Sequence, residues 1–382
     1  MKRKIVYISG TRADYGLMQS TLREIGKRDN LELEIIATGM HLMDEFGNTA
    51  DLIERDGFKV HRVNEIYQAD NKRSMAIFVG GFIKSLTEKI DLIRPDIILL
   101  LGDRGEMLAG AIVGAYLSIA VAHLHGGEKS STVDDLVRNA ITKLAQIHLP
   151  ATIESAKRIK SMGEDPARVF VVGAPGLDAI LNETFTGPED LANKYGLDLN
   201  APLFLVIQHP VTLESKCSGE QMEETMKAIS DMKYQTILIY PNADAGGREM
   251  IQIIKKFSDR SHIKPFKNID RSDYLGLMRI ACAIIGNSSS AIIEAPSFNL
   301  PAINVGSRQR GRERGANVID VGYSKNEIKS AIFEALHDEE FKQRIRNSAN
   351  PYGDGKSGKK IGDILEGISI DEDLLQKRTI FN

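Results

Sequence analysis

Cysteine is scarce in this sequence, which argues against a disulfide-stabilised protein. Only two cysteines, Cys217 and Cys282, occur among 382 residues, and they form neither a C-x-x-C motif nor the spacing of a metal site. Proteins built on a disulfide framework carry more cysteines at regular spacings. We therefore expect a protein of a reducing compartment.

Long hydrophobic runs are missing as well. The first apolar run, residues 5–8, is followed at once by Ser9 and Gly10, so it is too short for a signal peptide or a membrane span. We expect localisation in the cytoplasm and no membrane partner.

A third missing feature is a basic surface pattern. The net charge is −3, and no block of Lys and Arg interleaved with aromatic residues occurs. Binding to a phosphate backbone requires such a patch, so nucleic acid is not expected as a partner. A small anionic ligand stays open, because a few well-placed arginines are enough to bind it.

What the sequence does contain is a regular alternation of short apolar runs and longer amphipathic stretches. A chain of 382 residues is too long for one hydrophobic core. Runs that are apolar on both faces predict strands of a parallel sheet, and their alternation with helices predicts doubly wound domains. We thus expect an α/β protein with two Rossmann-like, doubly wound domains that face each other across a cleft.

The expected elements fall into two similar halves. The first half has strands at 5–8, 33–37, 59–63, 97–101, 120–124 and 169–172, and helices at 17–27, 75–93, 106–116, 134–145 and 152–162. The second half has strands at 204–207, 236–240, 262–265, 283–285, 302–305 and 318–321, and helices at 221–232, 248–256, 272–279, 291–297 and 325–336. The polar segment 182–188, which contains Gly-Pro, indicates a linker. We expect one domain at 1–182 with the catalytic loops, a second at 189–365, and a tail at 366–382 that returns to the first.

Ligands of such sheets bind beyond the carboxyl ends of the strands, so the loops there are the candidate sites. The first loop carries Arg12 at the start of a helix, where free N–H groups and a guanidinium favour an anion. Asp103 and Arg104 follow a later strand and can act as a general base beside a phosphate-binding group. The alternatives are a plain turn with Arg12 in a solvated ion pair, and Asp103 as a helix N-cap.

The densest group of titratable side chains lies between positions 123 and 135. It contains two histidines, a glutamate and two aspartates, namely His123, His125, Glu128, Asp134 and Asp135. Burying so many titratable groups is costly, which favours acid–base chemistry. The alternatives are a zinc site at the H-x-H pair, and a structural reading with His123 in the core and Asp134 as a helix N-cap.

Three loops in the second half carry polar groups that suit a phosphate. His209 lies in Gln208-His209-Pro210-Val211-Thr212, and a loop from Pro241 leads into a helix. Gly286-Asn287-Ser288-Ser289-Ser290 opens a helix that contains Glu294, and its hydroxyl and N–H groups can hold a phosphate while the carboxylate binds ribose. Four arginines follow in 306–315, either as phosphate ligands or as surface ion pairs.

Taken together, these loops resemble one family. The motifs, in order, are Thr11-Arg12-Ala13-Asp14-Tyr15-Gly16, Gly102-Asp103-Arg104, Gly126-Gly127-Glu128 with Asp134-Asp135, the 208–212 loop, Gly286-Asn287-Ser288-Ser289 and Arg308-Gln309. Along nearly the whole chain the sequence is similar to the hydrolysing UDP-N-acetylglucosamine 2-epimerases of sialic-acid precursor synthesis. The resemblance implies two Rossmann-like domains in the GT-B arrangement, with UDP held mainly by the second.

The family's reaction is also implied by the resemblance. UDP is eliminated across C1–C2 to give a 2-acetamidoglucal, and water then adds to release N-acetylmannosamine, with no metal or redox cofactor. By match of motifs, Asp103 and Asp134 are catalytic carboxylates. The implied UDP ligands are Arg12, Arg104, His209, Asn242, Ser288, Ser289, Glu294 and Arg308, and His209 is counted with the catalytic group as well.

One position departs from the family's pattern. Where some members have a catalytic glutamate in H-x-E-G-G-E, this chain has His125. Its proton-transfer role falls to His125 itself or to Glu128, and an imidazole with a reference pKa of about 6.5 is capable of it. The substrate is left open between UDP-N-acetylglucosamine and UDP-N,N'-diacetylbacillosamine, and a non-hydrolysing epimerase, a glycosyltransferase and a nucleotide-sugar sensor are the other readings.

Self-association is a further expectation. The helical stretches 75–93 and 106–116 are apolar enough to spare a face for another copy, although core packing explains them equally well. We expect a homodimer or homotetramer.

Overall fold

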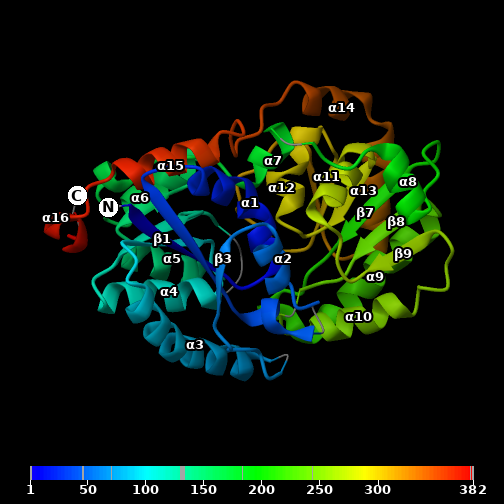
Figure 1. Cartoon of the computed structure of the whole chain (residues 1–382). Coiled ribbons are helices and arrows are strands. Elements are labelled where there is room, and N and C mark those ends of the chain that lie inside the picture. The colour runs from blue at the N-terminus through cyan, green and yellow to red at the C-terminus, as the bar shows by residue number, and fades with distance from the viewer. Residues whose placement is uncertain are drawn as a thin grey trace. The chain divides into compact units, whose positions relative to one another are not determined.

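A computed structural model of the chain is shown in Figure 1, and it describes residues 2–44, 47–69, 71–129, 134–182, 184–242, 244–378 and 380. The chain divides into two compact units. The first comprises Met1–Glu128, Val133–Leu181 and Tyr352–Asn382, and the second comprises Lys129–Thr132 and Asn182–Pro351. The chain re-enters the first unit at Tyr352, whereas the second domain predicted from the sequence runs to residue 365.

The first unit contains a parallel six-stranded sheet. Its strands are β1 (Arg3–Ser9), β2 (Leu31–Ala37), β3 (Lys59–Arg62), β4 (Ile97–Leu101), β5 (Ala120–Leu124) and β6 (Ile147–Leu149). Their order, β3-β2-β1-β4-β5-β6, is that of a Rossmann-type sheet. The order reverses between β1 and β4, so the loops after these two strands flank the position where such sheets bind ligands.

Helices cover both faces of this sheet, because successive strand residues point to opposite faces and are apolar on both. Ile5 and Tyr7 of β1 belong to one core, and Val6 and Ile8 belong to the other. Helices α1 (Arg12–Gly26) and α15 (Ser357–Gly367) pack side by side over the first core (Figure 1). Three helices pack over the second, namely α3 (Lys72–Ile93), α4 (Gly105–Tyr116) and α5 (Asp134–Leu144).

The second unit repeats the same plan. Its strands are β7 (Leu203–Ile207), β8 (Gln235–Ile239), β9 (Ile263–Phe266), β10 (Ala283–Gly286), β11 (Ala302–Val305) and β12 (Val318–Val321), in the parallel order β12-β11-β10-β7-β8-β9. Phe204 and Val206 of β7 enter a core with α9 (Ser218–Met232), α10 (Gly247–Lys255) and α13 (Lys325–His337). Here the order reverses between β7 and β10.

Shorter elements complete the two units. They are η1 (Gly39–Leu42), α2 (Ala50–Arg55), α6 (Ile153–Ser161), η3 (Pro166–Arg168), α7 (Gly176–Asn182), α8 (Pro188–Tyr195), η4 (Thr212–Cys217), α11 (Arg271–Ile280), α12 (Ser290–Ile293), η5 (Ala295–Phe298), α14 (Glu339–Arg346) and α16 (Glu372–Leu375). In the first unit the Asp178 carboxylate accepts the backbone N–H groups of Ser357 and Gly358, at 2.9 and 2.6 Å, and so caps α15. None of the helices in the described part of the chain is both long and apolar enough to cross a membrane.

The predicted fold class, an α/β protein with two Rossmann-like, doubly wound units, is confirmed. Strands β4, β5, β11 and β12 have the predicted bounds. The predicted strand at 169–172 is wrong, because only a single bridge joins Val169 to His148. His148 lies in β6, a three-residue strand that the sequence analysis missed because a histidine interrupts its apolar run.

Candidate active site

Polar loops follow the central strands of the first sheet, and each begins at the carboxyl end of its strand. Arg12 follows β1, Asp103 and Arg104 follow β4, and His125 and Glu128 follow β5. Since β1 pairs with β4, and β4 with β5, these loops share one edge of the sheet. The structure thus places the loops that carry Asp103, His125 and Glu128, three candidate catalytic residues of the first domain, along one edge of the sheet.

Arg138 of α5 forms hydrogen bonds with three residues of these loops and of its own helix. Its guanidinium donates to the carboxylate of Asp103, to Asp135 at 2.5 Å and to the backbone carbonyl of Glu128 at 2.9 Å. The Arg138 side chain is only 1% exposed, whereas that of Asp103 is 25% exposed. Asp103 is therefore a surface-facing carboxylate held by a buried cation, and it is not a helix N-cap, because Arg104 occupies that position of α4.

The charge of Arg138 is stabilised by its neighbours. Burial alone would lower its pKa, but attraction to Asp103, Glu128 and Asp135 outweighs burial and raises the pKa above its ordinary value. A permanently charged guanidinium in turn favours the ionised form of a carboxylate at hydrogen-bond distance. The Arg138 guanidinium can therefore hold the Asp103 carboxylate as an anion in one orientation.

His125 and Glu128 form a second pair in the same loop. The backbone of His125 is left-handed, with φ 61°, which turns the chain directly after β5. Its Nδ1 lies 2.5 Å from Oε1 of Glu128, whose side chain is 2% exposed. A carboxylate partner places the imidazole proton on Nδ1, so the lone pair is on Nε2, and this tautomer can accept a proton.

His123 is a core histidine and takes no part in this group. It is fully buried, its Nε2 donates to the carbonyl of Gly102 at 2.8 Å, and Nδ1 faces the Thr142 hydroxyl at 3.3 Å. Burial lowers its pKa to about 3, so the ring is neutral. Because both nitrogens are engaged, His123 and His125 do not form a zinc-binding pair. The described residues include no group of three or more His, Cys, Asp or Glu side chains able to hold a metal ion.

The loop after β1 is built around a buried aspartate. Asp14 accepts the backbone N–H groups of Gly10 and Thr11, at 3.0 and 2.8 Å, and Thr11 accepts the N–H of Asp14 in return. This capping box starts α1 and places Arg12 at its first position. Burial raises the pKa of Asp14 to about 6, against the opposing effect of the Ser9 hydrogen bond.

In the second unit, an asparagine orients the predicted histidine. Asn287 accepts the backbone N–H of His209 at 2.7 Å and donates to its carbonyl at 2.9 Å. Nδ1 of His209 accepts the backbone N–H of Asn242 at 3.1 Å, which leaves Nε2 as the proton-bearing nitrogen of the neutral ring. His209 is thereby arranged as a hydrogen-bond donor, the role that a phosphate oxygen requires.

The loop 286–290 after β10, called the serine loop below, contains side chains that differ in how far their polar groups are already engaged. Ser289 is the N-cap residue of α12, but its side chain makes no cap hydrogen bond. The Ser288 hydroxyl contacts that of Ser290 at 3.0 Å. Glu294 is 2% exposed and accepts a hydrogen bond from Arg271, so one of its oxygens is already engaged by a guanidinium.

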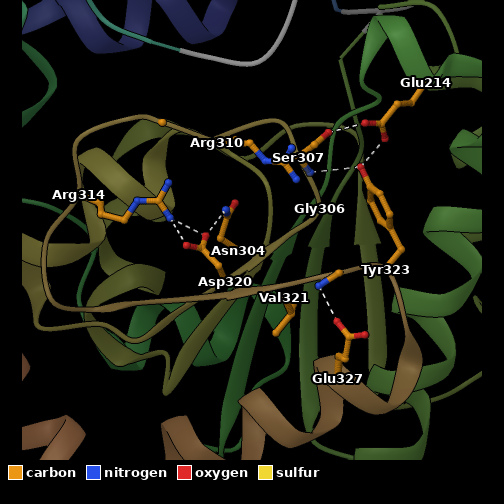
Figure 2. Close-up of a pocket in the computed structure, with 12 residues that line it drawn as sticks. Glu214, Asn304, Gly306, Ser307, Arg310, Arg314, Asp320, Val321, Tyr323 and Glu327 are labelled. Atoms are coloured by element: carbon orange, nitrogen blue, oxygen red, sulfur yellow. Dashed lines mark hydrogen bonds and ion pairs between the residues drawn. The ribbon is translucent and has the colours of Figure 1, made fainter.

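The arginine loop after β11 is partly internal. Arg308 donates to the carbonyl of Asn287 at 3.1 Å, whereas Arg314 pairs with Asp320. A pocket of about 590 Å³ lies beside this loop, and Figure 2 shows residues that line it. In it the carboxylate of Glu214 accepts from Ser307 at 2.5 Å and from Tyr323 at 2.7 Å. Of the two alternatives for these arginines, the ion pair applies to Arg314, whereas Arg308 lies against the serine loop.

Two residues of the site escaped the sequence analysis as individual candidates. Arg138 was hidden inside a helical pattern, although the Asp135-x-x-Arg138 spacing places acid and base on one helix face. Asn287 was part of a quoted motif, but its role depends on the backbone of His209, which is 78 positions away in sequence. Only the folded chain shows that contact.

Comparison with known proteins gives consistent results. A family model described as UDP-N-acetylglucosamine 2-epimerase matches residues 23–366. A Legionella pneumophila protein named UDP-N,N'-diacetylbacillosamine 2-epimerase (hydrolyzing) is 40% identical over 378 residues, which are 99% of each chain. A Campylobacter jejuni protein named GDP/UDP-N,N'-diacetylbacillosamine 2-epimerase (hydrolyzing) is 37% identical, over 90% of this chain and 89% of its own. A crystal structure of UDP-GlcNAc 2-epimerase from Neisseria meningitidis, bound to UDP-GlcNAc, matches the fold with a TM-score of 0.81 over 95% of this chain and 99% of that one, at 20% identity.

Proposed function

Since the chain belongs to the UDP-N-acetylglucosamine 2-epimerase family, we propose that it is a hydrolysing UDP-N-acetylglucosamine 2-epimerase. Its products would be UDP and N-acetylmannosamine, a sialic-acid precursor. The observation that supports this most is the pairing of a buried Arg138 with Asp103 beside the His125–Glu128 pair. A pure binding protein would not require two acid–base groups at one sheet edge.

The proposed reaction has two steps. In the first, a base removes the proton from C2 while the C1–O bond breaks, and UDP leaves with the bonding electrons to give a 2-acetamidoglucal. In the second, water adds across C1=C2, with hydroxyl to C1 and a proton to C2 on the face opposite to the one that lost it. The free sugar formed is the 2-epimer.

The first unit would carry the proton transfers. We assign the removal and the return of the C2 proton to Asp103 and to the His125–Glu128 pair. Asp103 is held as an anion, and Nε2 of His125 can accept a proton. Asp134, at the first position of α5, is the further carboxylate of this group. Positioned groups of this kind contribute about 10²- to 10⁴-fold each to proton transfer.

The second unit would hold UDP. His209 as an Nε2–H donor, Asn242 beside it, and Arg308 against the serine loop are suited to phosphate oxygens. Ser288 and Ser289 would add hydroxyl donors, and Glu294 would bind the ribose hydroxyls. From the first unit, Arg12 and Arg104 would offset the charge that develops on the leaving diphosphate.

Product analysis tests this proposal. The protein is incubated with UDP-N-acetylglucosamine, and the mixture is separated by anion exchange and examined by NMR. Free UDP and N-acetylmannosamine in equal amounts are expected. UDP-N-acetylmannosamine without free UDP would identify a non-hydrolysing epimerase, and untouched substrate with measurable UDP binding would identify a sensor or a transferase that lacks its acceptor.

A second substrate, UDP-N,N'-diacetylbacillosamine, is favoured by the similarity to the Legionella and Campylobacter proteins that are named as its hydrolysing 2-epimerases. The chemistry at C1 and C2 is the same, and the difference lies in the acetamido group at C4 and the missing hydroxyl at C6. Parallel kcat/KM measurements with both sugars decide between them. The true substrate is expected to be preferred by at least about tenfold, since a site built for a polar group rejects its absence.

The oligomeric state is part of the same proposal. Helices α3 and α4 pack against each other, yet Ile77, Leu92 and Tyr116 remain more than half exposed. We propose that these side chains contribute to a homodimer or homotetramer. Light scattering of the purified protein, compared with a Leu92→Glu variant, tests this, and a monomeric wild-type protein would refute it.

A further inference from the structure

Glu106 is a buried carboxylate that the proposed chemistry does not use. It lies in the first turn of α4, two positions after Arg104, and its side chain has no exposed surface. A charged carboxylate is costly to bury unless a cation or several donors compensate it. What surrounds Glu106 therefore indicates what it is for.

Two side chains contact the Glu106 carboxylate and also contact each other. Oε2 accepts Nε–H of Arg104 at 3.3 Å, and Oε1 accepts the Tyr67 hydroxyl at 2.9 Å. Nη2 of Arg104 donates to the same Tyr67 hydroxyl at 3.4 Å. Nε and Nη2 lie on one edge of the planar guanidinium, so the two contacts together set the direction of its plane.

The carboxylate also fills the space between two glycine loops. A Cβ at Gly10, in the loop after β1, would collide with the Glu106 side chain, and one at Gly39, after β2, would lie 3.1 Å from Oε1. Tyr67 follows β3, and Arg104 follows β4. Loops from four strands of the first sheet therefore meet at this one carboxylate.

The electrostatic effect of Glu106 extends to a neighbouring loop. The pKa of Asp14 is raised chiefly by burial, and the Ser9 hydrogen bond opposes this effect. Repulsion from Glu106 raises the pKa of Asp14 further. Burial and then Glu106 likewise raise the pKa of Tyr67. The raised pKa of Tyr67 keeps its hydroxyl protonated as a donor to Glu106, whereas the repulsion between Glu106 and Asp14 is unfavourable and would be relieved if Glu106 were replaced by a neutral residue.

We infer that Glu106 is a positioning residue that holds the Arg104 guanidinium toward the diphosphate of the substrate, with Tyr67 as its second support. The inference rests on the proposed function, because Arg104 as a diphosphate ligand is part of that proposal. Glu106 acts through Arg104 and not through contact with the substrate. A preorganised guanidinium loses less side-chain freedom when the ligand binds, which strengthens binding.

The test is a double-mutant cycle on UDP affinity, measured by calorimetry with the full chain. Arg104→Met is expected to weaken UDP binding about 30-fold, and Glu106→Gln about tenfold, because a charge-assisted contact is lost or misdirected. In the Arg104→Met background, Glu106→Gln is expected to add less than about twofold, since coupled residues are not additive. Binding of uridine, which has no phosphate, should change less than about twofold in both single variants.

Controls separate this role from a general structural one. Glu154→Gln makes the same chemical change at an exposed position of the first unit and should leave UDP affinity unchanged. Tyr67→Phe removes one support without removing a buried charge, and is expected to weaken UDP binding about threefold. If Glu106→Gln does not fold, the Tyr67→Phe cycle with Arg104→Met gives the same test.

Several results would overturn the inference. Tighter UDP binding in Glu106→Gln would mean that the carboxylate merely neutralises Arg104, and equal effects in both Arg104 backgrounds would mean that it acts elsewhere. An Arg104→Met variant with unchanged UDP affinity would also overturn it, while normal turnover by that variant would leave the proposed function standing. Failure of the proposed function itself would appear as wild-type protein that releases no UDP from its substrate.

Discussion

The two units have the same strand order, but the candidate side chains that follow their strands, Asp103 and His209, are held by different chemical groups. In the first unit the groups are ionic, with Arg138 bound to Asp103 and Asp135 and a carboxylate paired with His125. In the second unit the contacts that hold His209 run through the amide of Asn287 and backbone groups, although ion pairs such as Arg271–Glu294 occur near by in the same unit. A shared fold therefore does not determine a shared role. Ionic pairs set protonation states, whereas amide contacts orient donors without changing their charge.

The largest expected effect concerns the ionic site. Asp103→Asn should lower kcat by about 10²- to 10⁴-fold, because it removes a positioned acid–base group. The affinity for UDP should change less than about threefold, since the second unit supplies most of the proposed UDP ligands. Asp91→Asn, at an exposed position of α3, is the matched control. A parallel loss of UDP binding would contradict the division of roles between the units.

Stability is the next comparison, between a buried and an exposed arginine. Arg138→Met should destabilise the protein by about 2–3 kcal/mol, because the partly exposed Asp103 and Asp135 would lose their counter-charge and the Glu128 carbonyl would lose its donor. Arg62→Met removes a partner of Asp51 at the surface and should cost less than about 1 kcal/mol. Denaturant titrations of both variants measure the difference. Equal losses would mean that the Arg138 cluster is no more than a surface ion pair.

In the second unit the expected effect falls on binding. Asn287→Ala removes both contacts that hold His209 and should weaken UDP binding about 10- to 100-fold. The kcat at saturating substrate should fall much less than in the Asp103 variant. Asn200→Ala, an exposed position of the same unit, serves as control for calorimetric titrations. A large loss of kcat with unchanged UDP affinity would reverse the assignment of this unit.

The last expected effect is the pH dependence of stability that His123 causes. Its folded-state pKa of about 3 lies below the ordinary value of 6.5, so between these values the unfolded chain binds more protons than the folded one. Stability therefore falls as the pH drops from 6.5 toward 3, with a contribution of up to about 1.4 kcal/mol per pH unit from this residue. His123→Gln should unfold with a shallower pH dependence in that window. An unchanged slope in urea titrations from pH 6.5 to 4 would contradict the buried, neutral state of the ring.

Much of this fold could be predicted from the sequence because parallel strands buried on both faces are short, uninterrupted apolar runs. Strands β4 and β5 are examples of such runs. The interrupted run around His148 was misread, and α15, which begins at Ser357, was not predicted, since its start depends on Asp178 from a distant segment. Local pattern does not contain such contacts.

The candidate site shows the same limit. Loops after strands are visible in sequence, so Asp103, His125 and His209 could be named as candidates. Their partners could not, because Arg138, Glu106 and Asn287 act through contacts between separate loops. That Asp103 is held by a cation and His209 by an amide became clear only from those partners.

The most direct test of the account follows the hydrogen at C2. Wild-type protein and the Asp103→Asn variant are incubated with UDP-N-acetylglucosamine in deuterated water, and the released sugar is examined by NMR and mass spectrometry. Full deuteration at C2 of N-acetylmannosamine is predicted for the wild type, with a rate at least about 100-fold lower for the variant. Released sugar that keeps its original hydrogen at C2 would contradict proton transfer at this site.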